Sequence, residues 1–105
     1  MKFENVTPHH VTVITPNGPV TFPRTNDIAR VSQTTTQVGT VDGVPIYKTV
    51  FGAVEGMPVP QEGVIYIVSS LVRIAIPDRQ DVVSPGELVR DSAGFVIGCK
   101  GFVTN

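Results

Sequence analysis

Cysteine is nearly absent from this sequence, and tryptophan is missing altogether. The single cysteine, Cys99, cannot form an intrachain disulfide, and its isolation excludes a zinc site built from cysteine pairs. Aromatic residues make up only 7% of the chain, although hydrophobic residues make up 41%. A core of this composition must consist mainly of valine and isoleucine, which favour β-strands over helices.

Charged residues are also few, at 16% of the chain, and the eight basic and nine acidic residues leave a formal net charge of −1. No overall field would concentrate such a protein on nucleic acid or on an anionic membrane, so we expect neither as a partner. No apolar run reaches transmembrane length, and residues 1–5 lack the apolar core of a signal peptide. We therefore expect a cytoplasmic protein.

Proline and glycine, in contrast, are frequent and evenly distributed. The nine prolines and ten glycines punctuate the chain at short intervals, which is typical of many short strands joined by turns. A chain of 105 residues can bury a hydrophobic core without disulfides or a metal. We expect one domain that spans residues 1–105.

The longest apolar run, VIYIV at residues 64–68, predicts a central strand buried on both faces, because it is rich in β-branched residues and too short for a membrane span. Apolar residues at spacings of three and four over 71–76 then predict one or two helical turns, which Pro77 ends. Residues 82–83, followed by the turn at 84–86, predict another short strand.

Three predicted hairpins surround this central segment. They pair residues 11–15 with 20–22, 28–38 with 44–50, and 87–90 with 95–103. Prolines beside the first hairpin place it at a sheet edge, and the second hairpin has an Asp-Gly turn and a strand whose alternation predicts one buried face. We expect a mostly-β fold, a small barrel or roll of antiparallel hairpins with one short helix; the alternative is a small α+β sandwich.

The most informative polar residues follow the central strand. Ser69 and Ser70 are placed to cap the predicted helical turn, and Arg73 and Arg79 could add bidentate contacts to a phosphate or carboxylate. This pattern outlines an anion site, although it lacks the glycines of a phosphate-binding loop. The competing interpretation is a plain helix cap with two surface arginines.

Opposite charges also cluster at residues 78–81 and 90–91. Asp81 beside Arg79, and Arg90 beside Asp91, could form structural ion pairs across neighbouring strands, or they could line a ligand site. Acid–base catalysis by these carboxylates would need a second feature, such as a phosphate loop or a metal triad, and none is present.

The remaining reactive side chains give no site. His9 and His10 are adjacent, so in an extended segment they point to opposite faces and cannot readily share a metal ion. Cys99 lies in a predicted strand, where a free cysteine is normally packed in the core, and no spacing brings a base to it. We expect no catalytic residue, no bound metal and no cofactor.

Four segments of the chain carry a resemblance to other proteins. They read NVTPHHVTV (5–13), VFGAVEGMPVPQEGVIYIVSSLV (50–72), PDRQDVVSPGELVRD (77–91) and GFVIGCKGF (94–102). In these segments the chain resembles a family of small uncharacterised proteins of bacteriophages, prophages and some bacterial genomes. The resemblance brings no activity with it. It implies a small accessory protein in the host cytosol that binds or inhibits a host component.

These observations lead to three hypotheses. The first is that the protein binds and sequesters a small anionic ligand, such as a nucleotide-derived signal, and so counteracts a host defence, with Ser69, Ser70, Arg73, Arg79, Asp81 and Arg90 as the ligand-binding residues. The second is that it inhibits a host protein through a sheet edge or loop. The third is a small hydrolase. Exposed strand edges and the low charge also predict a homo-oligomer.

Overall fold

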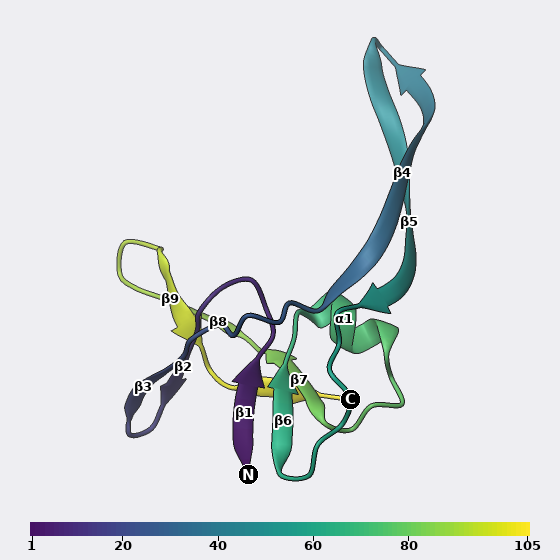
Figure 1. Cartoon of the computed structure of the whole chain (residues 1–105). Helices are drawn as coiled ribbons and strands as arrows, with labels where there is room; N and C mark the ends of the chain where they lie inside the picture. Colours follow the sequence, from purple (N-terminus) through teal and green to yellow (C-terminus); the bar gives the residue numbers. More distant parts are fainter.

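The computed structural model describes residues 1–105, which form ten strands and one short helix. The strands make two four-stranded sheets and a separate two-stranded hairpin (Figure 1). Their bounds are β1 Lys2–Asn5, β2 Val11–Thr15, β3 Gly18–Phe22, β4 Arg30–Val41, β5 Val44–Glu55, β6 Val64–Ile67, α1 Ser70–Ala75, β7 Val82–Pro85, β8 Leu88–Arg90, β9 Val96–Cys99 and β10 Phe102–Thr104. The mostly-β fold with one short helix is confirmed. The helix does not have the length or apolar character needed to cross a membrane.

The first sheet has the strand order β1-β6-β7-β10. Strand β6 is central, as predicted, but it runs parallel to both of its neighbours, and only β10 is antiparallel to β7. The prediction of antiparallel hairpins throughout was therefore wrong for this sheet. Parallel strands require a long crossover, and the segment that contains α1 supplies it between β6 and β7.

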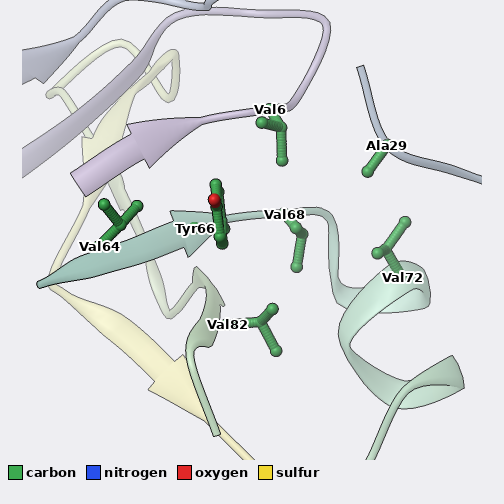
Figure 2. Packing of buried hydrophobic residues seen from close by; sticks show 7 residues of the cluster. All are labelled: Val6, Ala29, Val64, Tyr66, Val68, Val72 and Val82. Carbon is green, nitrogen blue, oxygen red and sulfur yellow. The ribbon is translucent and has the colours of Figure 1, made fainter. Parts of the chain in front are cut away.

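The body of the protein has three layers, with the first sheet between α1 and the second sheet. Side chains alternate along β6, so Tyr66 and Val68 pack with Val72 of α1, as Figure 2 shows, whereas Ile67 packs with Val13 and Cys99 of the second sheet. The central strand is thus buried on both faces, as predicted. The sheets do not close into a barrel, and the alternative of an α+β sandwich fits the structure.

The second sheet has the order β3-β2-β9-β8. The predicted first hairpin is its β2–β3 pair, and the proline-flanked strand β3 lies at the sheet edge, as expected. The chain changes sheets between β9 and β10, close to Gly101. The predicted strand over residues 95–103 is therefore two strands, and only β9 pairs with β8. Three phenylalanines, Phe3, Phe22 and Phe102, join the two sheets through ring centroids 5.1–5.8 Å apart.

The hairpin of β4 and β5, which we call the arm, projects away from the body (Figure 1). Its turn is the predicted Asp-Gly pair, with Asp42 at φ 50° and Gly43 at φ 77°, as a two-residue turn of type I′ requires. The prediction that this hairpin buries one face was wrong, because nearly every arm residue beyond the base is exposed. Only 14 of the 105 residues are buried, and none of the residues from Ser32 to Glu55 is among them.

Candidate functional site

The predicted helix cap after β6 is present. The Ser69 Oγ accepts a hydrogen bond from the Val72 backbone N–H at 3.3 Å. This bond satisfies one of the backbone N–H groups that have no partner within the first turn of α1. Ser70 is the first helical residue, and its side chain is exposed. The structure therefore brings the two serines to the start of a six-residue helix, where the first serves as a cap.

Arg79 and Asp81 form a bidentate ion pair just before β7. The Arg79 Nε lies 2.7 Å from Asp81 Oδ1 and the Arg79 Nη2 lies 2.8 Å from Asp81 Oδ2, while Nη2 also donates to the Pro58 carbonyl at 3.2 Å. Hydrogen bonds from Arg79 hold the pKa of the Asp81 carboxyl below its usual value. The same pair raises the pKa of Arg79. The Arg79 guanidinium therefore joins the loop that contains Pro58 to the segment before β7. Most of its N–H donors already have hydrogen-bond partners within the protein.

Arg73 is likewise bound within the protein. Its Nε donates to the Ser84 Oγ at 2.8 Å, and its Nη1 donates to the Asn105 Oδ1 at 3.4 Å. Arg90 lies on the second sheet, where its Nη1 donates to the Gly94 carbonyl at 2.9 Å. The structure thus places Arg73 and Arg79 beside the first sheet with internal partners. It does not bring Arg90 to them.

We expect Arg79→Ala to lower the free energy of unfolding by about 1–3 kcal/mol, because the half-buried Asp81 carboxylate loses its partner. A carboxyl whose pKa is lower in the folded than in the unfolded state stabilises the folded protein at pH values above the unfolded-state pKa. This contribution is lost as the pH falls through the folded pKa. Urea unfolding should therefore show a difference between wild type and variant at pH 7 that shrinks below about pH 4. The control is Arg90→Ala, for which we expect a change under about 0.5 kcal/mol; equal losses for both variants would contradict the prediction.

The two histidines and the cysteine do not gather into a cluster that could hold a metal ion. His10 Nδ1 accepts a hydrogen bond from the Arg24 backbone N–H at 3.2 Å, so the neutral ring carries its proton on Nε2. His10 and the buried Cys99 line the same open hollow of about 160 Å³, but in this tautomer Nδ1, the basic nitrogen, is already occupied. No three His, Cys, Asp or Glu side chains gather closely enough to hold a metal ion.

The surface that sequence reasoning missed is the arm. Its exposed apolar residues are Val38, Val41, Val44, Ile46, Tyr47, Val50 and Phe51, each between 44% and 62% exposed. A cavity of about 180 Å³ lies where the arm meets α1, and all five residues that line it are apolar. One signal was readable in the sequence, since residues 31–54 contain only two charged residues, Asp42 and Lys48.

Comparisons with known proteins add no relative: the chain matches no family model, and its comparison with curated proteins and with solved structures gave no match. The resemblance to small phage proteins therefore stays a prediction.

Proposed function

We propose that this chain is a protein-binding protein whose contact surface is the β4–β5 arm. The observation that carries the proposal is the exposure of seven large apolar residues along a hairpin that stands clear of the body (Figure 1). Monomeric proteins rarely expose contiguous apolar surface beyond a few hundred Å², and larger patches mark interaction sites. The arm is the part of this chain with the most such surface.

The physics of an isolated hairpin supports the same proposal. A two-stranded ribbon is marginally stable in water, because neither face is covered and each residue still loses its conformational freedom. Twelve-residue strands are also far longer than the connection between Ala29 and Gly56 requires. A partner that covers the arm would supply the missing burial and would stabilise the ordered hairpin.

The low charge of the arm bears on the class of partner. With one acidic and one basic residue between positions 31 and 54, the arm has no field that would attract nucleic acid or a small anion. Aliphatic side chains and the two aromatic rings suit a protein surface of similar character. This proposal takes up the second hypothesis of the sequence analysis and moves the contact from a sheet edge to the arm.

The small-anion hypothesis ranks second, because Arg73 and Arg79 already donate to partners within the protein. Its test is a thermal-shift panel of nucleotides and nucleotide-derived signals, in which a ligand of the native state raises the melting temperature by mass action. Mass spectrometry of the same ligands tests the hydrolase hypothesis, since a hydrolase would convert one of them. A role as a phage accessory protein that counteracts a host defence is part of the proposal, and it rests on the resemblance alone.

Photo-crosslinking in the cells that produce the protein tests the arm as a contact surface. With p-benzoylphenylalanine in place of Tyr47, which is 59% exposed on the arm, irradiation should give a discrete covalent product with a protein partner. The matched control places the same group at Val59, which is 73% exposed in the loop before β6. Equal product patterns at the two positions, or none at Tyr47, would contradict the proposal. Adding Ile46→Asp to the Tyr47-labelled chain should abolish the product.

A further inference from the structure

We infer that the partner of the arm is a second copy of this chain, and that the tip of each arm lies on the apolar pocket at the base of the other arm. This inference rests on the proposed function, because it names the partner of the same surface. It requires three things of the structure. A pocket must be open to a partner, an apolar tip must match it, and the geometry must let two copies exchange these contacts.

The pocket lies between the base of the arm and helix α1. Val31 and Phe51 line it from the arm, and Leu71, Ile74 and Ala75 line it from the helix. Its volume of about 180 Å³ is enough for an aliphatic side chain, since an apolar cavity of about 150 Å³ takes up a benzene-sized group. Leu71 and Ile74 are 51% and 63% exposed, so the pocket is open to a partner.

The tip of the arm supplies apolar side chains on one face. Val41 pairs with Val44 across the hairpin, and Ile46 is the next residue of β5 on that face, because cross-strand partners and alternate residues share a face. The tip face is therefore built from aliphatic residues, and Lys48, two residues beyond Ile46, is the first charged residue of β5 on it. Asp42 lies beyond it in the turn.

The twist of the hairpin turns this tip face toward the side of the pocket. Phe51 lies an odd number of residues from Ile46 along β5, so the two side chains belong to opposite faces of the ribbon. Strands β4 and β5 cross over each other once between base and tip, as a twisted two-stranded ribbon does (Figure 1). A half-turn of this twist between tip and base carries the apolar tip face and the apolar base face to the same side of the arm.

Two copies related by a twofold axis can then exchange these contacts. Val44 at the tip is seven residues from Phe51 at the pocket, which is about 24 Å along the strand at ~3.4 Å per residue. When two such arms run side by side in opposite directions, each tip reaches the pocket of the other copy. Both contacts form at once, as a closed, isologous dimer requires. In this register Asp42 of one copy comes level with residue 53 of the other, two residues from the Arg30–Glu55 pair that begins the arm.

The area available matches what a stable dimer needs. With fully exposed areas of roughly 150–180 Å² for an aliphatic residue and 250 Å² for an aromatic residue, the exposed apolar residues that would face a second copy present about 600 Å². They are Val41, Val44, Ile46 and Phe51 of the arm and Leu71 and Ile74 of α1. Each partner of a typical stable interface contributes about 800 Å². Stable interfaces begin at about 600 Å² a side, so the arm and α1 together reach the lower end of that range.

Light scattering with size exclusion, across a range of concentrations, tests the inference with complementary variants. The wild-type chain should elute at twice the 11.2 kDa of one chain. We expect Ile46→Lys, at the tip, and Ile74→Glu, at the pocket, each to give a monomer, because each homodimer would hold a charge against an apolar surface. Mixing the two variants should restore a dimer. One contact then pairs lysine with glutamate, and the other pairs the two unchanged residues.

Val59→Lys is the matched control, since it adds the same charge at an exposed residue away from the arm, and it should leave the dimer intact. Circular dichroism should show unchanged folding for all variants, because Ile46 and Ile74 are surface residues. A wild-type monomer at every concentration, a mass that grows without limit, or single variants that fail to mix into a dimer would each overturn the inference. The first of these would leave the arm as a contact surface for another protein, which the crosslinking at Tyr47 decides separately.

Discussion

Replacing Asn5 by alanine is expected to lower the free energy of unfolding by about 2–4 kcal/mol, because one buried side chain makes four hydrogen bonds. Its Nδ2 donates to the carbonyls of His9 and Phe22 at 2.8 and 2.9 Å. Its Oδ1 accepts from the Thr7 backbone N–H at 3.0 Å and from the Thr7 Oγ1 at 2.6 Å. The residue thus joins the end of β1 to the following loop and to β3. Urea unfolding measures the loss.

Asn17→Ala is the control for this prediction, since Asn17 is an exposed turn residue, and we expect it to change stability by less than about 0.5 kcal/mol. Asn5→Asp tests the two Nδ2 hydrogen bonds separately from those of Oδ1. It keeps the shape of the side chain but places a carboxylate oxygen next to the carbonyl oxygens of His9 and Phe22. Its stability should rise as the pH falls and the carboxyl becomes protonated. Equal stability of the Asn5 and Asn17 alanine variants would show that the network is not a structural junction.

Tyr66→Ala is expected to cost about 3–5 kcal/mol, the usual loss for a fully buried aromatic side chain. Tyr66 lies at the centre of the cluster between the first sheet and α1 (Figure 2), and its hydroxyl donates to the Val59 carbonyl at 3.0 Å. Tyr66→Phe keeps the ring and loses only this hydrogen bond, so we expect a loss of about 1 kcal/mol. The difference between the two variants measures the packing of the ring.

The same residue makes stability depend on alkaline pH. Burial, followed by the negative charges of Glu4 and Asp81, raises the pKa of Tyr66 above its ordinary value near 10. A raised pKa means that the neutral phenol stabilises the fold below pH 10, and that this contribution is lost as the pH rises through the folded-state pKa. The melting temperature of the wild type should therefore fall above pH 10 more steeply than that of Tyr66→Phe. Tyr47→Phe on the exposed arm is the matched control and should follow the wild type.

Short-range chemistry explains which parts of the fold were predictable. The turn at Asp42 and Gly43 needs positive φ at both residues, and the Ser69 cap depends on a neighbour three residues away. Such features involve only adjacent stretches of chain. The β2–β3 hairpin, the short helix and the strand over residues 64–67 were accordingly correct.

The partners of the arginines in the candidate anion site were not predictable, for the opposite reason. Ser69, Ser70 and Arg73 are close in sequence, but what each arginine can bind depends on residues far along the chain. Arg73 meets Ser84 and Asn105, and the Arg79 guanidinium is bound by Asp81 and by the Pro58 carbonyl. No spacing in the sequence indicates that these donors are already in use.

By itself, the sequence determined a single mostly-β chain with a valine-rich central strand, a capped helical turn and hairpins at the right turns, because composition and local backbone preference act within a few residues. The tertiary structure alone decided that β6 pairs in parallel on both sides, that the arginines bind within the body, and that the longest hairpin leaves that body. Alternating apolar residues look the same whether the face they form is covered by their own chain or by another. Only the packing of the whole chain shows that the face of the arm is uncovered.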